Sequence, residues 1–141
     1  MSTNIFDKKV LQYKIICDIS IIKDGTAMKD TGQNNYRRGV MSLVLLSLLK
    51  REDMYGYQLV QETERSSGGR LTTQEGSLYP VLYRLLEQGL ISDRKVLVGK
   101  RMTRVYYHLE PAGEEKLRDL IAEYESVTAG VFAIIRGEGA E

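Results

Sequence analysis

The chain has 141 residues, of which 43% are hydrophobic and 28% charged, values typical of one soluble domain, or of one domain with a dimerisation element. A net charge of +1 excludes a polycation, and the single cysteine, Cys17, excludes an intramolecular disulfide and a cysteine-based metal site. No signal peptide is visible, and the most apolar run, Val40–Leu49, is far shorter than the roughly 20 residues of a membrane span. We therefore expect a cytoplasmic protein.

The charges are distributed unevenly along the chain. Basic residues outnumber acidic ones between Glu75 and Arg104, whereas acidic residues outnumber basic ones between Val105 and Glu141. This pattern predicts that the middle of the chain meets a polyanion and that the end does not. Charge alone leaves open the alternative of a mixed, solvated surface.

The first 35 residues predict an N-terminal extension and a linker. Within residues 1–22, apolar side chains recur both at alternate positions, as in a strand, and at positions 11, 15, 19 and 22, as in a helix. Residues 23–35 are rich in glycine, aspartate, threonine and asparagine, a composition typical of a linker. We expect either an ordered arm that packs on its own domain or on a partner subunit, or a disordered tail.

Two helices are predicted next. The first, Arg38–Lys50, is apolar nearly all round, which indicates a helix that is buried or lies between subunits. The second, Met54–Glu64, can be capped by Asp53, and Gly56 near its start permits close approach to a neighbouring helix. Residues 65–70 form the turn region that follows.

A third helix is predicted to begin near Glu75 to Ser77 and to end at Gly89, which suits a left-handed turn. Thr72 and Glu75 have the spacing of a capping box, and Ser77 is a competing N-cap. Pro80, which lacks an N–H group, fits the first turns of such a helix. The apolar residues that recur at helical spacing are Leu78, Leu82, Leu85 and Leu86.

Two β-branched and aromatic runs, Ile91–Val98 and Thr103–Leu109, predict a hairpin, with a basic turn over residues 99–102. A short amphipathic helix followed directly by a basic-tipped hairpin is the pattern of a winged helix-turn-helix. The helix has the right size for the major groove of DNA, and the hairpin can lie on the backbone beside it. We assign this domain to residues 36–110.

Helical geometry predicts which side chains of the third helix face DNA. Arg84 is expected to bind a guanine or a phosphate, and Thr73, Ser77 and the helix N-terminus to bind phosphates. The complete predicted set on the helix is Thr73, Ser77, Tyr79, Pro80, Tyr83 and Arg84. Tyr79 and Tyr83 lie at the edge of the apolar face, where they serve either DNA contact or packing.

In the hairpin, Lys100 and Arg101 are expected to contact phosphates or the minor groove, with Lys95 and Arg104 flanking them. The alternative is that these basic residues only deter aggregation along an exposed strand.

The last predicted helix spans residues 111–136 and is followed by a loose tail over residues 137–141. Pro111 suits its first turn, and the helix is too long to bury its apolar stripe on so small a domain. We expect a dimerisation helix that is coiled-coil-like; the alternative is that it folds back on the first helix. The stripe consists of Leu117, Leu120, Ile121, Tyr124, Val127, Val131 and Ile134.

No arrangement of residues predicts catalysis. His108 is the only histidine and stands in a strand beside Tyr106 and Tyr107, where a structural role is expected. No metal-ligand spacing and no glycine-rich phosphate-binding loop occurs. We expect a protein that is not an enzyme and that has no catalytic residues, no metal and no cofactor.

Four segments together resemble the PadR family of transcriptional regulators: Met54–Leu59, Glu75–Leu85, Gly89–Ile91 and Tyr106–Gly113. The resemblance covers about residues 38–136 and does not include the stretch before Asn35. Ser77 stands where the family often has threonine, and Arg104–Val105 stands where it often has Arg-Lys.

The resemblance implies a mainly α fold with a small β-hairpin (α+β), that is, a winged helix-turn-helix domain plus a long C-terminal dimerisation helix that packs on the N-terminal helices of the partner. It also implies a homodimeric repressor on an inverted-repeat operator, relieved by a small aromatic or amphipathic effector. Surplus apolar surface on the first and last helices suggests a cavity near the dimer interface. The alternative function is a winged-helix protein-interaction module without DNA binding.

Overall fold

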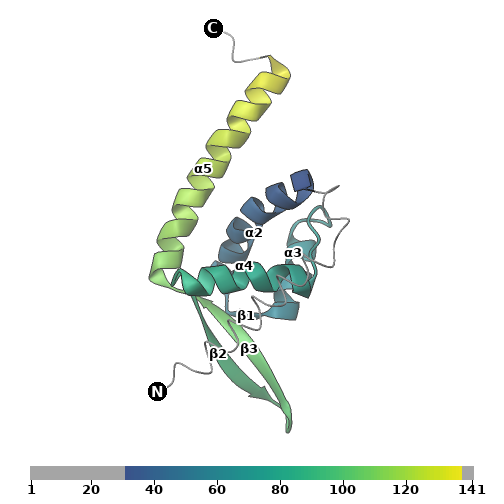
Figure 1. The fold of residues 1–141 in the computed structure, drawn as a ribbon, viewed down its shortest axis with the longest axis vertical. Helices are drawn as coiled ribbons and strands as arrows, with labels where there is room; N and C mark the ends of the chain where they lie inside the picture. The colour runs from purple at the N-terminus through teal and green to yellow at the C-terminus, as the bar shows by residue number, and fades with distance from the viewer. Residues whose placement is uncertain (1–30, 138–141) are drawn as a thin grey trace.

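The computed structural model describes residues 31–137, and side-chain environments from residue 39 onward. Figure 1 shows a body of three helices from which a β-hairpin and a long helix extend in opposite directions. The elements are α2 (Thr31–Arg51), β1 (Met54–Tyr55), α3 (Gly56–Ser66), α4 (Glu75–Glu87), β2 (Ile91–Val98), β3 (Met102–Leu109) and α5 (Pro111–Arg136).

Helix α2 begins earlier than the sequence predicts. It starts at Thr31 rather than near Arg38, so residues 31–35 are helix and the predicted linker is wrong there. No proline interrupts these positions. Intrinsic propensity is a weak prior, and it does not stop a helix that continues from a strongly packed segment. The expectations for residues 1–30, including the arm and Cys17, lie outside the described residues.

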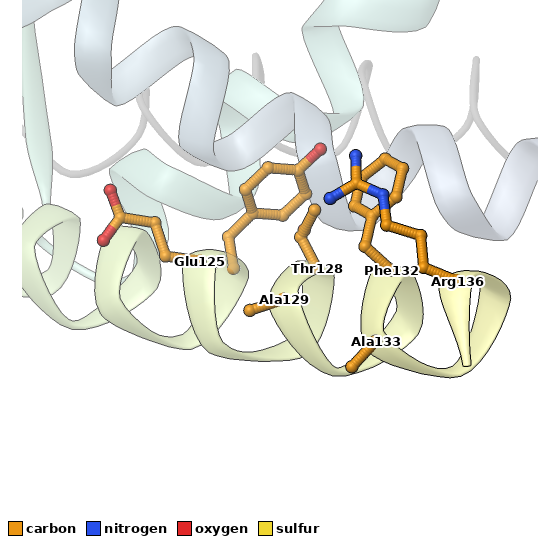
Figure 2. Close-up of a pocket in the computed structure, with 7 residues that line it drawn as sticks. Glu125, Thr128, Ala129, Phe132, Ala133 and Arg136 are labelled. Carbon is orange, nitrogen blue, oxygen red and sulfur yellow. The ribbon is translucent and has the colours of Figure 1, made fainter. Parts of the chain in front are cut away.

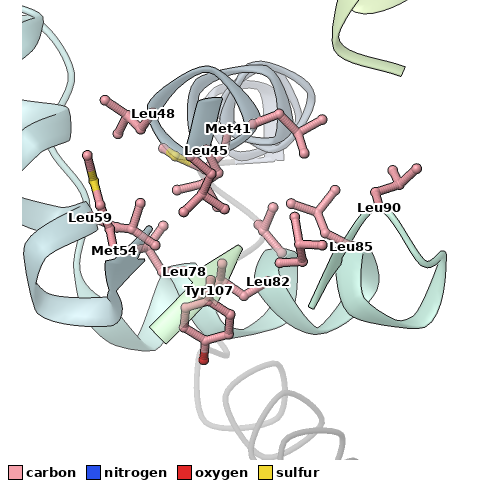
Figure 3. Close-up of a cluster of buried hydrophobic side chains, with 14 of the residues drawn as sticks. Met41, Leu45, Leu48, Met54, Leu59, Leu78, Leu82, Leu85, Leu90 and Tyr107 are labelled. Carbon is pink, nitrogen blue, oxygen red and sulfur yellow. The ribbon is translucent and has the colours of Figure 1, made fainter. Parts of the chain in front are cut away.

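The core lies where α2 crosses α3 and α4. Leu45 of α2, Leu59 of α3 and Leu78 of α4 are fully buried, and Figure 3 shows such side chains converging between the helices. Burial of one large aliphatic side chain stabilises the fold by about 1.5–3 kcal/mol. The core therefore fixes α4 by its apolar face and leaves the opposite face of α4 outward.

The two ends of α4 differ in how well the sequence predicts them. The predicted C-terminal turn is confirmed: Gly89 has φ 71°, and the N–H groups of Gly89 and Leu90 donate to the carbonyls of Leu86 and Leu85, each at 3.0 Å. The predicted capping box is wrong. Gln74 is the N-cap residue, and no side chain caps the helix. Neither Thr72 nor Ser77 is therefore the N-cap.

The hairpin is part of a three-stranded antiparallel sheet with the order β1-β3-β2. Met54 pairs with Tyr107 and Tyr55 with Tyr106, while β2 and β3 pair from Ile91–Leu109 to Val98–Met102. The sequence predicted Met54 and Tyr55 to be helical; this is wrong, because helix α3 begins only at Gly56. Two residues are too few for an alternating pattern to reveal a strand.

Helix α5 is anchored at its start and exposed beyond it. The N–H of Glu110 donates to the Leu90 carbonyl at 3.0 Å, and Leu117 is buried in the core that α2 provides. The predicted span is confirmed, because α5 covers Pro111–Arg136 and Gly137 ends it with φ 70°. None of the helices in residues 31–137 is both long and apolar enough to cross a membrane.

Candidate nucleic-acid interface

The outward face of α4 carries the side chains predicted for DNA contact. Ser77 and Arg84 are exposed, one near the start of the helix and one in its last turn. The other predicted residues on and before this helix are half-buried: Thr73, Tyr79, Pro80 and Tyr83. Pro80 lies inside the helix, in its second turn, so the Gly76 carbonyl receives no i→i−4 hydrogen bond from residue 80, and the expected place in the first turn is not met.

Tyr79 has a packing contact that accounts for its half-buried position. A Cβ built on Gly56 would lie 3.4 Å from the Tyr79 hydroxyl and 3.7 Å from two ring atoms. The predicted close approach at Gly56 is therefore confirmed, and the neighbour is the ring of Tyr79 on α4. This contact joins the start of α3 to the first turns of α4.

Gly76 is a position that the sequence analysis did not include. It is exposed, and a Cβ built on it meets no atom within 4 Å. A rotation of 100° per residue puts Gly76 on the same side of α4 as Pro80 and Arg84. Its place on the outward face could therefore have been predicted from the sequence. A glycine there allows the closest approach of another molecule to the helix backbone.

An open groove of about 310 Å³ joins α4 to the hairpin. Glu75 and Tyr79 line it from the first turns of α4, and Thr103 and Arg104 line it from β3. Tyr55, Gly56 and Tyr57 contribute the third wall, between β1 and α3. Of the residues predicted for DNA contact, Tyr79 and Arg104 line this groove from opposite sides, and the others lie outside it.

The basic residues of the hairpin are differently placed. Lys95, Lys100 and Arg101 are exposed, the last two in the turn that follows Gly99, whose φ is 70°. Arg104 is half-buried, because its guanidinium lies 4.4 Å from the centre of the Tyr55 ring. Three of the four predicted cations therefore have free access to solvent, and the fourth is held against the sheet.

Beside Arg104 the outer sheet face carries an ionic cluster that the sequence analysis did not foresee. Asp53 binds Arg94 through one carboxylate oxygen and lies 2.7 Å from His108 Nδ1 through the other. Burial of the Asp53 carboxylate raises its pKa, but the hydrogen bonds with His108 and Arg94 outweigh this effect and hold the pKa below its ordinary value of 3.8.

His108 is thus part of a structural contact between β3 and the residue before β1. Among residues 31–137 no group of three or more histidine, cysteine, aspartate or glutamate side chains is arranged to hold a metal ion.

The predicted dimerisation residues of α5 fall into two groups. Leu117 is only 2% exposed and Leu120 is half-buried, so both belong to the chain's own core or its edge. The distal residues are exposed: Ile121, Tyr124, Val127, Val131 and Ile134. Phe132 and Ile135, which the sequence analysis left out, extend this apolar surface, and Ile134 is 82% exposed.

Among the side chains described from residue 39 onward, those that line a hollow of about 480 Å³ on distal α5 all belong to this helix. Figure 2 shows Glu125, Thr128, Phe132 and Arg136 projecting from one side of α5, and the Arg136 guanidinium lies 4.9 Å from the centre of the Phe132 ring.

A helix-turn-helix with an exposed second helix, followed by a three-stranded sheet whose hairpin projects beside that helix, defines a winged helix-turn-helix protein. The chain belongs to the PadR-like family of transcriptional regulators, since the model of the "Transcriptional regulator PadR-like family" matches residues 45–119. The resemblance inferred from the sequence is thereby confirmed. The family consists of regulators and not of enzymes, as the sequence analysis expected.

Individual relatives agree with this assignment. The chain is 38% identical over 69 residues to the transcriptional regulator YqjI of Escherichia coli (strain K12), a match that covers 49% of this chain and only 33% of YqjI. It is 23% identical over 88 residues to the negative transcriptional regulator PadR of Bacillus subtilis (strain 168), which covers 62% of this chain and 48% of that protein. The chain therefore spans less than half the length of these two relatives.

Among solved structures, a PadR family transcriptional regulator from Eggerthella lenta DSM 2243 is similar with a TM-score of 0.64 and 28% identity, covering 78% of this chain and 94% of that one. Bacillus subtilis PadR in complex with operator DNA is similar with a TM-score of 0.55 and 24% identity, covering 58% of this chain and 47% of that one. The second likeness bears on the fold alone.

Proposed function

We propose that this protein is a homodimeric repressor that binds an inverted-repeat operator through α4 and the β2–β3 hairpin. The observation that carries the proposal is the single groove between the first turns of α4 and strand β3, with exposed basic residues further along the hairpin. Support comes from Bacillus subtilis PadR, which shares the fold and was solved in complex with operator DNA.

In this arrangement α4 enters the major groove with its outward face. Arg84 reads a guanine or binds a phosphate, and Ser77 with the free N–H groups at the start of α4 binds the backbone. Gly76 lets the helix approach closely, since nothing of the protein occupies the space above it. Lys100 and Arg101 contact the phosphates beside the groove, flanked by Lys95.

The homodimer forms through distal α5. Residues 126–135 contain no charged side chain, and a helix without a polar face is stable in water only when other chains cover it. Two recognition helices related by a twofold axis then meet half-sites one helical turn apart, roughly 34 Å. The partner also lines the hollow on α5 in this arrangement.

That completed hollow is the place for a small aromatic or amphipathic effector, because Phe132, Thr128 and Arg136 offer an apolar ring, a hydroxyl and a cation side by side. We propose that the protein represses transcription, in keeping with the name of the negative transcriptional regulator PadR. Binding to an operator requires that the protein works in the cytoplasm.

The test is fluorescence anisotropy with a duplex from the upstream region of the protein's own gene, together with an unrelated duplex, at low and at physiological salt. We expect preference for the cognate duplex and a steep loss of affinity with salt, because phosphate contacts release counterions. Lys100→Ala/Arg101→Ala should weaken binding to both duplexes. The matched control, Lys116→Ala/Arg118→Ala, removes the same charge from exposed positions of α5 and should leave binding unchanged.

Genomic fragments extend the search if the first duplex shows no preference, since the operator can lie elsewhere. Absence of binding to any DNA at low salt would overturn the regulator proposal. The chain would then be a winged-helix module that binds another protein through the same surface.

A further inference from the structure

Two arginines stack on tyrosine rings on the outer face of the sheet. The Arg104 guanidinium lies 4.4 Å from the centre of the Tyr55 ring, and the Arg94 guanidinium lies 5.5 Å from the centre of the Tyr106 ring. The two rings also contact each other edge to face, with centres 5.4 Å apart. The stacks thus form one continuous row across the three strands.

The strand register explains this row. Tyr106 of β3 pairs with Tyr55 of β1 on one side and with Arg94 of β2 on the other, so these three side chains share a face of the sheet. Arg104 lies two residues before Tyr106 on β3 and therefore points to the same face, at the diagonal position to Tyr55. Diagonal neighbours on a sheet lie within reach of long and aromatic side chains.

The two arginines differ in their charge partners. Arg94 forms an ion pair with Asp53, so its charge is compensated within the fold. Arg104 forms no ion pair with any residue that the structure describes. It also lines the groove between α4 and the hairpin, together with Tyr55. Arg104 is therefore a cation that the sheet orients without neutralising.

We propose that Tyr55 is a positioning residue, which holds the Arg104 guanidinium at the edge of this groove for a DNA phosphate. The inference rests on the proposed function and adds a residue that does not itself read or neutralise the DNA. An arginine side chain loses much rotamer freedom when it binds a phosphate. Stacking on Tyr55 removes part of that freedom before DNA arrives, so less is lost on binding.

A double-mutant cycle tests the proposal. The dissociation constant is measured over a series of salt concentrations for the wild type, Tyr55→Leu, Arg104→Gln and the double variant. Arg104→Gln should reduce the logarithmic salt slope by about 0.9, the value of one phosphate contact. Tyr55→Leu should weaken binding about two- to five-fold when Arg104 is present and have no effect when it is absent. Tyr55→Phe, which keeps the ring, should bind like the wild type.

Arg94→Gln is the matched control. It removes a stacked arginine from the same sheet face, but one whose charge Asp53 already compensates, so the salt slope should not change. Far-UV circular dichroism and thermal melting of Tyr55→Leu verify that β1 is still formed. The NMR chemical shift of Arg104 Nε–H tests the stack without DNA. The ring current of Tyr55 should displace this chemical shift, and Tyr55→Leu should return it to the value of an unstacked arginine.

The outcomes separate the two proposals. If the wild type binds DNA but Tyr55→Leu weakens binding equally with and without Arg104, the positioning role is refuted and the regulator stands. The same holds if Arg104→Gln leaves the salt slope unchanged. If the wild type binds no DNA at all, the regulator and the phosphate role of Arg104 both fail, even where the NMR signal shows that the stack exists.

Discussion

Gly113, in the first turn of α5, lies directly against the main chain of Leu90. A Cβ built on Gly113 would come within 2.0 Å of the Leu90 carbonyl oxygen and 2.6 Å of Leu109 Cδ1. This carbonyl accepts the hydrogen bond from the Glu110 N–H, so it has no freedom to move aside. The helix can start where it does only because residue 113 has no side chain.

Gly113→Ala should therefore destabilise the fold by about 3 kcal/mol, because overpacking against a fixed main chain outweighs the better helix propensity of alanine, which is worth about 1 kcal/mol. Urea unfolding followed by circular dichroism measures the change. Gly130→Ala, in the same helix, is the control. A Cβ built on Gly130 has no atom within 4 Å, so this substitution should be neutral or stabilising. Equal effects of both variants would contradict the contact with Leu90.

The Asp53 carboxylate predicts a dependence of stability on pH. Its pKa in the folded chain is lower than the ordinary 3.8, so its contribution is fully present above that value and is lost as the pH falls through the folded pKa. Asp53→Asn should cost at most about 1 kcal/mol at neutral pH, since its partners are largely exposed. The free energies of unfolding of wild type and variant should converge well below pH 3.8.

The control for that experiment is Asp119→Asn, on an exposed position of α5 that forms no ion pair within residues 39–137. Its effect on unfolding should be small throughout the same pH range. A difference between wild type and Asp53→Asn that persists unchanged at the acid end would show that the carboxylate charge is not the cause.

The distal apolar surface of α5 predicts how the proposed dimer can be broken. Val131→Glu/Ile134→Glu places charges on a surface that the partner should desolvate, and the dimer dissociation constant should rise on the order of 100-fold. Light scattering coupled to gel filtration follows the mass across protein concentrations. Ala122→Glu adds a charge at an exposed position about 180° around α5 from Val131 and should leave the dimer intact. A monomeric wild type would refute this interface.

Glu75 opposes DNA binding in the proposed geometry, since its carboxylate lines the groove in which Arg104 is to meet a phosphate. Glu75→Gln should therefore tighten DNA binding about two- to five-fold at low salt, and the gain should shrink at high salt because surface charges are screened. It should also cost α4 roughly 0.3–1 kcal/mol, because an acidic residue stabilises a helix N-terminus.

Glu123→Gln, on the polar side of α5, makes the same charge change far along the chain from the groove and should alter neither property. Anisotropy titrations at two salt concentrations are sufficient. Tighter binding by both variants would show that only the net charge matters, whereas weaker binding by Glu75→Gln would place Glu75 among the DNA contacts.

The sequence predicted those elements that have strong periodicity and clear ends. Strand β2, helix α5 and the Gly89 turn all lie where they were expected. The helix has a regular apolar pattern, the strand contains β-branched residues between two glycine-containing turns, and Gly89 suits the left-handed turn. The capping box failed, since two residues at the right spacing do not form a cap unless the backbone turns there. Strand β1 was missed, because Met54 becomes a strand residue only through its partner Tyr107, far along the chain.

The candidate site shows the same division. The exposure of Ser77 and Arg84 was predicted from the rotation of 100° per residue in an α-helix, which depends only on local geometry. The stack of Arg104 on Tyr55 and the binding of Asp53 by Arg94 and His108 could not be predicted, because each depends on how β1, β2 and β3 pair, and the sequence does not state that register. The surplus apolar surface of α5 was visible as a pattern, but the burial of Leu117 within its own chain was not.

The pairing of β1 with β3 has a consequence for how the chain folds. Met54 and Tyr107 meet as neighbours, and both helices of the helix-turn-helix lie in the chain between them. The two helices are therefore enclosed in a loop that closes late, after the hairpin has formed from local contacts. A fragment that ends before β3 should not hold α3 and α4 in place, so the proposed DNA-binding unit cannot be shortened to these two helices.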